Sequence, residues 1–395
     1  MWRKIFILMA VAALAAAALA DEAEDLFNLA NGYMARNEHD LAAETYSRLL
    51  TTFPDFQKAD VALYRKGWCL HALKRYADAE ATFRQLLAKF PNTDEAPKAL
   101  YLLGDSCVKQ KKLAEGAKAF LELVERAPDY AFAANALHRA GEALYQIKRY
   151  KEAADAYARI IADYPKYEHL PYAHYSLGWC RFELGDYKGA IEAFGAVVAK
   201  FPKSPVAAES QLKIGEAHLA LKAHDKAVAA FQKVLDEFPG DLSDDALMGI
   251  GRARFEQERY QEAARAFRKI VDDFPKSPLR EEALYNAGNS LLCAGAHQDA
   301  LKALDQTLAL VKKGPLAEKA TYARGLCLLK LGRSDEAIAA LSASAKAKSL
   351  EAIRPRVLFG LAEAYYAAKR YDDAAKTYQA VLDQAGDDPV AADAL

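Results

Sequence analysis

Residues Leu63 to Pro91 read LYRKGWCLHALKRYADAEATFRQLLAKFP, and this stretch contains the pattern that decides the fold. Gly67 is followed at fixed intervals by Ala79, then by Phe83 and then by Pro91. The small residue at the head of this pattern recurs with a period of 37, with a single interval of 36. The small positions are Ala30, Gly67, Gly104, Gly141, Gly178, Gly215, Gly251, Gly288, Gly325 and Ala362. The sequence therefore predicts ten repeats.

Each repeat has the pattern of two helices joined by a short turn. A glycine inside a helix costs about 0.5–1 kcal/mol relative to alanine, so the recurring glycine needs a compensating contact. We expect a close approach of the second helix, in which Ala79 supplies a matching small surface and Phe83 fills the space beside it. Proline then ends the second helix. In joints such as Phe201-Pro202-Lys203-Ser204-Pro205, we expect Ser204 to be the N-cap and Pro205 the first residue of the next helix.

The spacing of Gly, Ala-x3-Phe and Pro resembles the tetratricopeptide repeat, and the resemblance spans residues 22–395. It implies an all-α fold, a right-handed superhelical solenoid of ten helix–turn–helix repeats. The family consensus is about 34 residues long, and we expect the additional residues of each repeat to lengthen the first helix by about one turn.

This longer form is similar to an exported bacterial branch of the family. That branch includes outer-membrane-assembly lipoproteins, the coordinator protein of the Tol–Pal system, and repeat proteins of exopolysaccharide export. The chain lacks the lipid-attachment cysteine of the first group and the N-terminal coiled coil of the second.

Residues 1–20 have the composition of a secretory signal peptide. Arg3 and Lys4 precede an uncharged run, and Ala18-Leu19-Ala20 is a small-x-small cleavage site directly before an acidic run. We predict an exported protein, periplasmic in a diderm bacterium, with no integral membrane span after cleavage. Peripheral membrane association is left open, and an uncleaved N-terminal anchor is the alternative.

The repeats divide the chain into four segments. We expect a signal peptide (1–20), seven regular repeats (21–282), three divergent repeats without the Phe-Pro joint (283–388), and a partial C-terminal capping helix (389–395).

Composition and motifs argue against several functions. A net charge of -1 favours neither a nucleic-acid partner nor an acidic disordered tail. The sequence contains no phosphate-binding glycine loop, dinucleotide motif, zinc-protease motif or nucleophile elbow, and its histidines lack metal-ligand spacing. We therefore predict no enzyme activity, no cofactor and no metal site.

The five cysteines are predicted to stay unpaired. Cys69, Cys180 and Cys327 occupy a position that is small in every other repeat, so we expect buried packing residues. Cys107 and Cys293 lie one repeat away from Cys69 and Cys327, at a helix separation too large for a disulfide.

The family resemblance implies that ligands contact the first helices, just after the glycine and one turn later. Trp68 and Trp179 occupy a position after the glycine that is polar in most other repeats, and tryptophan is enriched at binding hot spots. Packing of these tryptophans on the first helix of a neighbouring repeat is the alternative. The predicted groove is formed by Tyr64, Trp68, His71, Tyr101, Asp105, Glu142, Tyr145, Tyr175, Trp179 and Phe182.

We predict a non-catalytic periplasmic scaffold that binds envelope proteins or peptides in this groove. Its role would lie in cell-envelope assembly, outer-membrane biogenesis or division. The alternative is a glycan-binding component of polysaccharide export or peptidoglycan handling, because aromatic side chains also stack on sugar rings.

Overall fold

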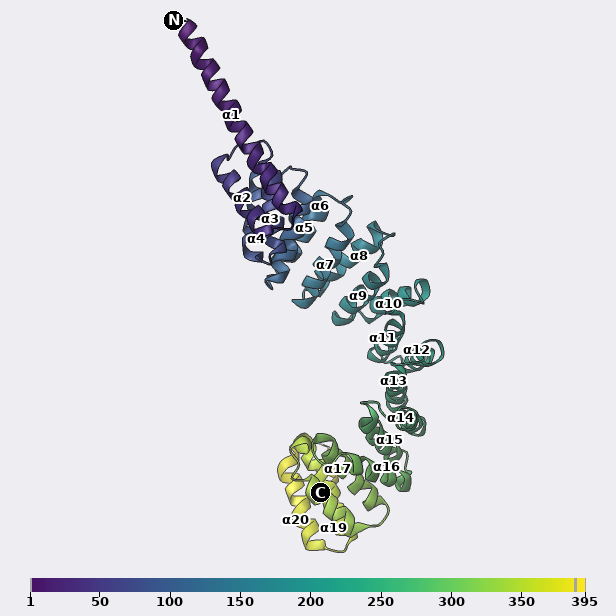
Figure 1. The fold of residues 1–395 in the computed structure, drawn as a ribbon. Helices are drawn as coiled ribbons and strands as arrows, with labels where there is room; N and C mark the ends of the chain where they lie inside the picture. The colour runs from purple at the N-terminus through teal and green to yellow at the C-terminus, as the bar shows by residue number, and fades with distance from the viewer. Residues whose placement is uncertain (1, 387–388, 395) are drawn as a thin grey trace. The chain divides into compact units, whose positions relative to one another are not determined.

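The computed structural model describes residues 2–386 and 389–394, and for residues 2–18, 385, 391 and 393 it describes the backbone alone. Short turns join one helix to the next along the chain (Figure 1). No residue in the described ranges lies in a β-strand. The predicted all-α fold of repeated helix pairs is confirmed. Within the same ranges, no helix is long and apolar enough to cross a membrane.

The chain divides into two compact units, residues 1–193 (unit 1) and residues 194–395 (unit 2), and the boundary falls within α10 (Tyr187–Lys200). Unit 1 contains α1 (Trp2–Ala35), α2 (His39–Thr52), α3 (Ala59–Ala72), α4 (Tyr76–Lys89), α5 (Ala96–Lys109), α6 (Leu113–Arg126), α7 (Ala133–Gln146), α8 (Tyr150–Asp163) and α9 (Leu170–Glu183). Unit 2 contains α11 (Ala207–Ala220), α12 (His224–Glu237), α13 (Ser243–Glu256), α14 (Tyr260–Asp273), α15 (Arg280–Cys293), α16 (His297–Leu310), α17 (Pro315–Lys330), α18 (Ser334–Ser344), the 3-10 helix η1 (Lys348–Ile353), α19 (Arg354–Ala367), α20 (Tyr371–Ala385) and α21 (Val390–Asp393). Odd-numbered helices up to α19 are the first helices of the repeats, and those from α1 to α7 and from α11 to α19 each pack on the second helix that follows.

Each first helix ends in the same tight turn. In the second repeat the Arg75 N–H donates to the Leu70 carbonyl at 2.9 Å and the Lys74 N–H donates to the His71 carbonyl at 2.9 Å, which is the Schellman pattern. Lys74 has a φ of 61°. The equivalent residues, all with positive φ, are Asn37, Lys74, Lys111, Lys148, Gly185, Lys222, Glu258, Gly295, Gly332 and Lys369. This turn lets the second helix fold back onto the first.

The joints between repeats differ from the expectation. Before α11, the Ser204 N–H donates to the Phe201 carbonyl at 2.9 Å and the Ala207 N–H donates to the Ser204 carbonyl at 3.0 Å. The helix begins at Ala207, with Val206 as its N-cap. The predicted capping role of Ser204 and the predicted helical position of Pro205 are therefore wrong. Both residues lie in two successive turns, a setting that suits proline and serine equally well.

In the second to the eighth repeat the first helix is not longer than the second. The helices α3 and α4 each have 14 residues, and the same length recurs in α5 and α6. We therefore assign the additional residues of each repeat to the joint, for example residues 90–95 between α4 and α5. The expectation of a lengthened first helix is wrong, because the double turn takes up the extra chain.

The core is built from the recurring glycine and the aromatic residue that faces it from the second helix. A Cβ added to Gly104 would lie 2.7 Å from Phe120 Cε1, and one added to Gly141 would lie 2.6 Å from Tyr157 Cζ. The aromatic ring, and not the alanine, is therefore the contact that requires glycine. The alanines are also fully buried, as Ala153 shows, and lie beside the ring.

The ends of the chain bear on two predicted segments. In α1 the first buried residues among those described are Ala23, Leu26 and Phe27. The predicted signal peptide falls mainly on residues whose side chains lie outside the described part, and it stays a prediction. Near the C-terminus, Val390 of α21 packs with Val381 of α20, within the segment predicted to cap the array; residue 395 lies outside the described residues.

Candidate functional site

All ten predicted groove residues belong to unit 1 and lie on four first helices. They are Tyr64, Trp68 and His71 on α3, Tyr101 and Asp105 on α5, Glu142 and Tyr145 on α7, and Tyr175, Trp179 and Phe182 on α9. The structure gathers four of them around one pocket and places the others elsewhere.

The pocket lies between neighbouring first helices and has a volume of about 460 Å³. This volume is within the range of small-ligand sites. We call it the α7–α9 pocket. Its lining residues are Glu142, Tyr145, Gln146, Tyr157, Tyr175, Ser176 and Trp179. Four of the ten predicted residues, Glu142, Tyr145, Tyr175 and Trp179, are among them.

Aromatic rings form the walls of this pocket. Tyr175 and Trp179 are one turn apart on α9, and their ring planes meet at 83° with centroids 6.3 Å apart. Tyr145 faces the pocket from α7, and its ring is also in edge contact with the ring of Tyr150 at 5.1 Å. The pocket therefore presents rings in more than one orientation.

Tyr157 lies at the base of the pocket and is only 2% exposed. Burial raises the pKa of its hydroxyl well above the usual value, while a hydrogen bond with Ser176 acts in the opposite direction. The same ring packs on Gly141. The glycine that shapes the core thus also allows Tyr157 to reach the pocket.

Glu142 supplies the pocket's carboxylate. Its side chain is 55% exposed, and its Oε1 lies 3.6 Å from His138 Nε2. The His138 side chain lowers the pKa of the Glu142 carboxyl, more than partial burial raises it. Glu142 is therefore ionised at neutral pH.

Asp105 does not line the α7–α9 pocket. It is 6% exposed, its Oδ2 lies 2.6 Å from His71 Nε2, and it forms an ion pair with Arg139. Burial raises the pKa of Asp105, but its hydrogen bonds and charge interactions with His71 and Arg139 outweigh burial and hold the pKa low. Asp105 and His71 thus tie α3, α5 and α7 together rather than lining a pocket with the other predicted residues.

The remaining predicted aromatics pack within the scaffold. The ring of Trp68 meets the ring of His39, the first residue of α2, at 5.1 Å and 82°, so Trp68 covers the preceding repeat. The ring of Tyr101 lies 5.6 Å from that of Phe120. Burial raises the pKa of Tyr64 to about 12.

Phe182 belongs to the same group of packing residues. Its ring lies 6.0 Å from the Trp179 ring and 5.1 Å from the Tyr187 ring. It contacts the lining residue Trp179 but is not itself among the lining residues.

Sequence reasoning missed Gln146, Tyr157 and Ser176. Tyr157 stands at the aromatic core position, so its pattern indicated packing alone. Equivalent positions in the repeats could have identified these residues, because a pocket of about 210 Å³ recurs at the same positions in unit 2. That pocket is lined by Arg252, Phe255, Glu256, Phe267, Asn286 and Asn289. The pocket is thus a property of the repeat, while its lining varies.

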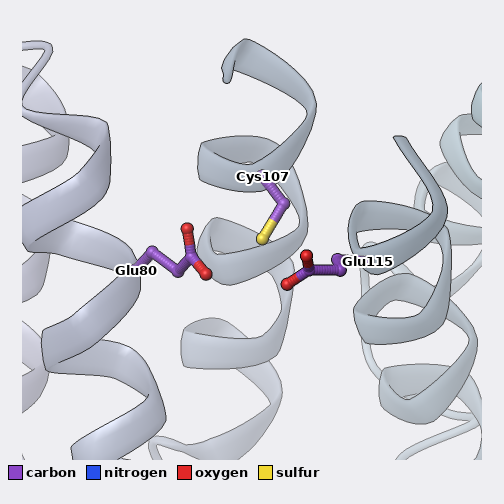
Figure 2. A group of neighbouring side chains, drawn as sticks. All are labelled: Glu80, Cys107 and Glu115. Carbon is purple, nitrogen blue, oxygen red and sulfur yellow. The ribbon is translucent and has the colours of Figure 1, made fainter. Parts of the chain in front are cut away.

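Another cluster contains metal-ligand atom types. Figure 2 shows Glu80, Cys107 and Glu115 pointing toward one another from three helices, with ligand atoms within 4.8 Å of each other. Glu80 already accepts hydrogen bonds from Gln110 Nε2 and Lys112 Nζ, both at 2.8 Å. Arg84 pairs with both glutamates.

The state of the thiol also argues against a metal at this cluster. Burial raises the pKa of Cys107 to about 11, so the thiol keeps its proton at neutral pH. Metals bind the thiolate, and basic side chains already neutralise the two carboxylates. We interpret the cluster as a charged network that joins α4, α5 and α6, and we assign no metal to it.

The five cysteines are unpaired in the structure. Cys69, Cys180 and Cys327 are fully buried, as expected for packing residues. Cys293 is exposed.

Solved structures share the fold. The structure of Naa15/Naa10 bound to HypK-THB matches 92% of this chain and 58% of that chain, with a TM-score of 0.53 and 12% identity. The C-terminal part of a TPR repeat-containing protein from Cytophaga hutchinsonii matches 65% of this chain and 98% of that one, with a TM-score of 0.47 and 16% identity. YrrB, a TPR protein with an unusual peptide-binding site, matches 52% of this chain and 98% of that one, with a TM-score of 0.42 and 19% identity. At these identities the likeness concerns the fold alone.

Sequence comparison gives the family. A search of curated proteins found no match. A tetratricopeptide-repeat family model matches residues 27–93, 75–131, 175–241 and 285–352, which together make up more than half of the chain. Two further tetratricopeptide-repeat models match residues 218–284 and 345–395, and residues 135–167. With the helix pairs and the glycine–aromatic contacts, these matches show that the chain belongs to the tetratricopeptide repeat family.

Proposed function

We propose that this protein is a non-catalytic scaffold that binds segments of other proteins in the α7–α9 pocket and acts in the bacterial cell envelope. The observation that carries the proposal is the pocket itself, where Tyr145, Tyr175 and Trp179 converge from two first helices. Aromatic side chains offer a large apolar contact area at a low cost in conformational entropy. A tryptophan in a concave site is a typical anchor for a partner protein.

A binding role fits the family, whose repeats are typically interaction scaffolds without catalysis. The pocket also fits an extended segment, because it opens between two repeats rather than inside one. A segment lying across the first helices would insert one side chain into it.

The location in the envelope is supported by the N-terminal sequence. Cleavage after Ala20 would remove the uncharged run and leave Ala23, a buried residue of α1, in place. The packing of the first repeat would therefore survive processing. We propose that the processed protein acts in the periplasm, in envelope assembly, outer-membrane biogenesis or division.

Site-specific crosslinking in living cells tests this proposal. A photoreactive amino acid at Gln146, in the pocket lining, should crosslink to a defined protein. The matched control carries the same group at Asp155, an exposed position on α8. Identical crosslinks from both positions would refute the pocket as the binding site.

A pull-down distinguishes binding of protein segments from the alternative, glycan binding. Purified peptidoglycan or exopolysaccharide should not retain the protein if the pocket binds protein segments. Retention that is lost on Trp179→Ala would favour glycan binding, because the same ring would then be stacking on sugar.

A further inference from the structure

We propose that the α7–α9 pocket takes a basic side chain, lysine or arginine, from the bound protein segment. This inference rests on the proposed function and specifies the chemistry of the partner. Two kinds of group in the pocket support it: aromatic ring faces and a carboxylate.

The ring geometry suits a cation. Aromatic faces attract ammonium and guanidinium groups, and cages built from several rings bind quaternary ammonium groups in the same way. Tyr175 and Trp179 form two walls at 83° to each other, and Tyr145 faces them from α7. A long basic side chain would run its methylene groups along one ring and place its charge near another.

The charge of the pocket is negative. Glu142 is the charged residue among the seven lining residues, and none of them is basic. Arg139 on α7 pairs with Asp105, and His138 Nε2 lies 3.6 Å from Glu142 Oε1 but is not among the lining residues. The charge of Glu142 contributes to the raised pKa of Tyr157, and the charge of Glu183 on α9 contributes to the raised pKa of Tyr145. A cation entering the pocket would thus meet a favourable field.

Comparison with the matching pocket of unit 2 shows that the repeat fold does not by itself dictate the lining of the α7–α9 pocket. Its register places Arg252 where unit 1 has Glu142, and Asn289 where unit 1 has Trp179. Phe255 and Phe267 keep the aromatic positions of Tyr145 and Tyr157. These two ring positions therefore recur in both units. The unit-2 pocket also has a carboxylate, Glu256, at the position of Gln146, but Arg252 accompanies it. A lining that combines a carboxylate with a tryptophan and contains no basic residue belongs to the α7–α9 pocket.

Small peptides test the inference directly. The probes are blocked pentapeptides Gly-Gly-X-Gly-Gly in which X is lysine, arginine, norleucine or glutamate. Binding to the full chain is followed by the ¹⁹F signal of 5-fluorotryptophan at position 179, assigned with Trp179→Phe. We expect saturable shifts with lysine and arginine, about tenfold weaker binding of norleucine, and no shift with glutamate.

A substitution at Glu142 tests how much its charge contributes to peptide binding. Glu142→Gln should weaken binding of the lysine peptide about two- to fivefold, the range for an exposed ion pair, and leave the norleucine peptide unchanged. Asp155→Asn, on the exposed face of α8, is the control and should change neither. Equal binding of norleucine and lysine, or no effect of Glu142→Gln, would overturn the inference.

Failure of this inference can be distinguished from failure of the proposed scaffold function. If no basic peptide shifts the signal while the Gln146 crosslink still captures a protein, the basic-anchor inference is wrong and the scaffold function stands. If the Gln146 crosslink does not differ from the Asp155 control, the proposed function is wrong whatever the peptides do.

Discussion

Phe83 lies against the backbone of Gly67 so closely that a Cβ at position 67 would be 2.5 Å from Phe83 Cε1. Three atoms of the ring lie within 2.9 Å of that point, so a side chain there and the present ring position exclude each other. Since Phe83 is fully buried, the ring has little space into which to move. This contact explains why the repeat retains glycine within a helix.

Gly67→Ala should therefore destabilise the protein, although alanine is the better helix former. Overpacking costs about 1–3 kcal/mol, and the gain in helix propensity offsets about 1 kcal/mol, so we expect a net loss of up to about 2 kcal/mol. Gly32→Ala in α1 is the control, because its added Cβ would meet only Arg36 Nη1 at 3.7 Å. Urea unfolding followed by circular dichroism should show opposite shifts, and a stabilised Gly67→Ala would contradict the packing argument.

At the turn that ends each first helix, we expect a substitution to glycine to stabilise the protein. Lys74 has a φ of 61°, a left-handed conformation that costs a non-glycine residue about 1–2 kcal/mol. Lys74→Gly should raise stability by about 0.5–1 kcal/mol, after allowing for the greater freedom of glycine in the unfolded chain. Gly185→Ala, at the equivalent turn with nothing within 4 Å of an added Cβ, should lower it by about 1 kcal/mol. A loss of stability in Lys74→Gly would argue against this account.

The repeat register of the fold was readable from the sequence because each small position is followed at a fixed distance by a large partner, which is aromatic in eight repeats and leucine in two. The joints were not readable, since Ser204-Pro205 suits a helix start and a double turn equally well. Of the ten predicted groove residues, Glu142, Tyr145, Tyr175 and Trp179 line one pocket, and binding of a partner there stays a prediction. Tyr157 was missed because a core position and a pocket floor have the same pattern within one repeat.

The pairing of Asp105 was missed for a geometric reason. His71 and Asp105 are separated by 34 positions in the sequence, and Arg65 hydrogen-bonds Asn31 over the same separation. This separation is shorter than the repeat period by about one helical turn. Helical side chains lean toward the N-terminus, so a first-helix residue meets the next repeat about one turn out of register. Comparing positions at that shorter separation would have indicated that Asp105 is a link between repeats.

This link makes stability depend on pH in a defined direction. The pKa of Asp105 is lowered from its usual value of 3.8, so its contribution is fully present above about pH 4 and is lost as the pH falls through the lower folded-state pKa. Asp105→Asn should cost about 2–3 kcal/mol at neutral pH, because the partly buried Arg139 loses its charged partner. The difference between wild type and variant should shrink toward about pH 3. A constant difference in urea midpoints across this range would rule the ionised pair out.

The two tryptophans of the repeat region should separate binding from packing. Trp179 lines the α7–α9 pocket, whereas Trp68 covers His39 of the preceding repeat. We expect Trp179→Ala to abolish the partner crosslink at Gln146, because its ring lines the pocket, and to lower the urea midpoint, because the ring also contacts Tyr175 and Phe182. Trp68→Ala should leave the crosslink intact and lower the urea midpoint, since an aromatic contact of about 0.5–1.5 kcal/mol is lost together with buried area. If Trp68→Ala also removes the crosslink at unchanged stability, the binding surface extends along α3, and the groove is longer than the pocket.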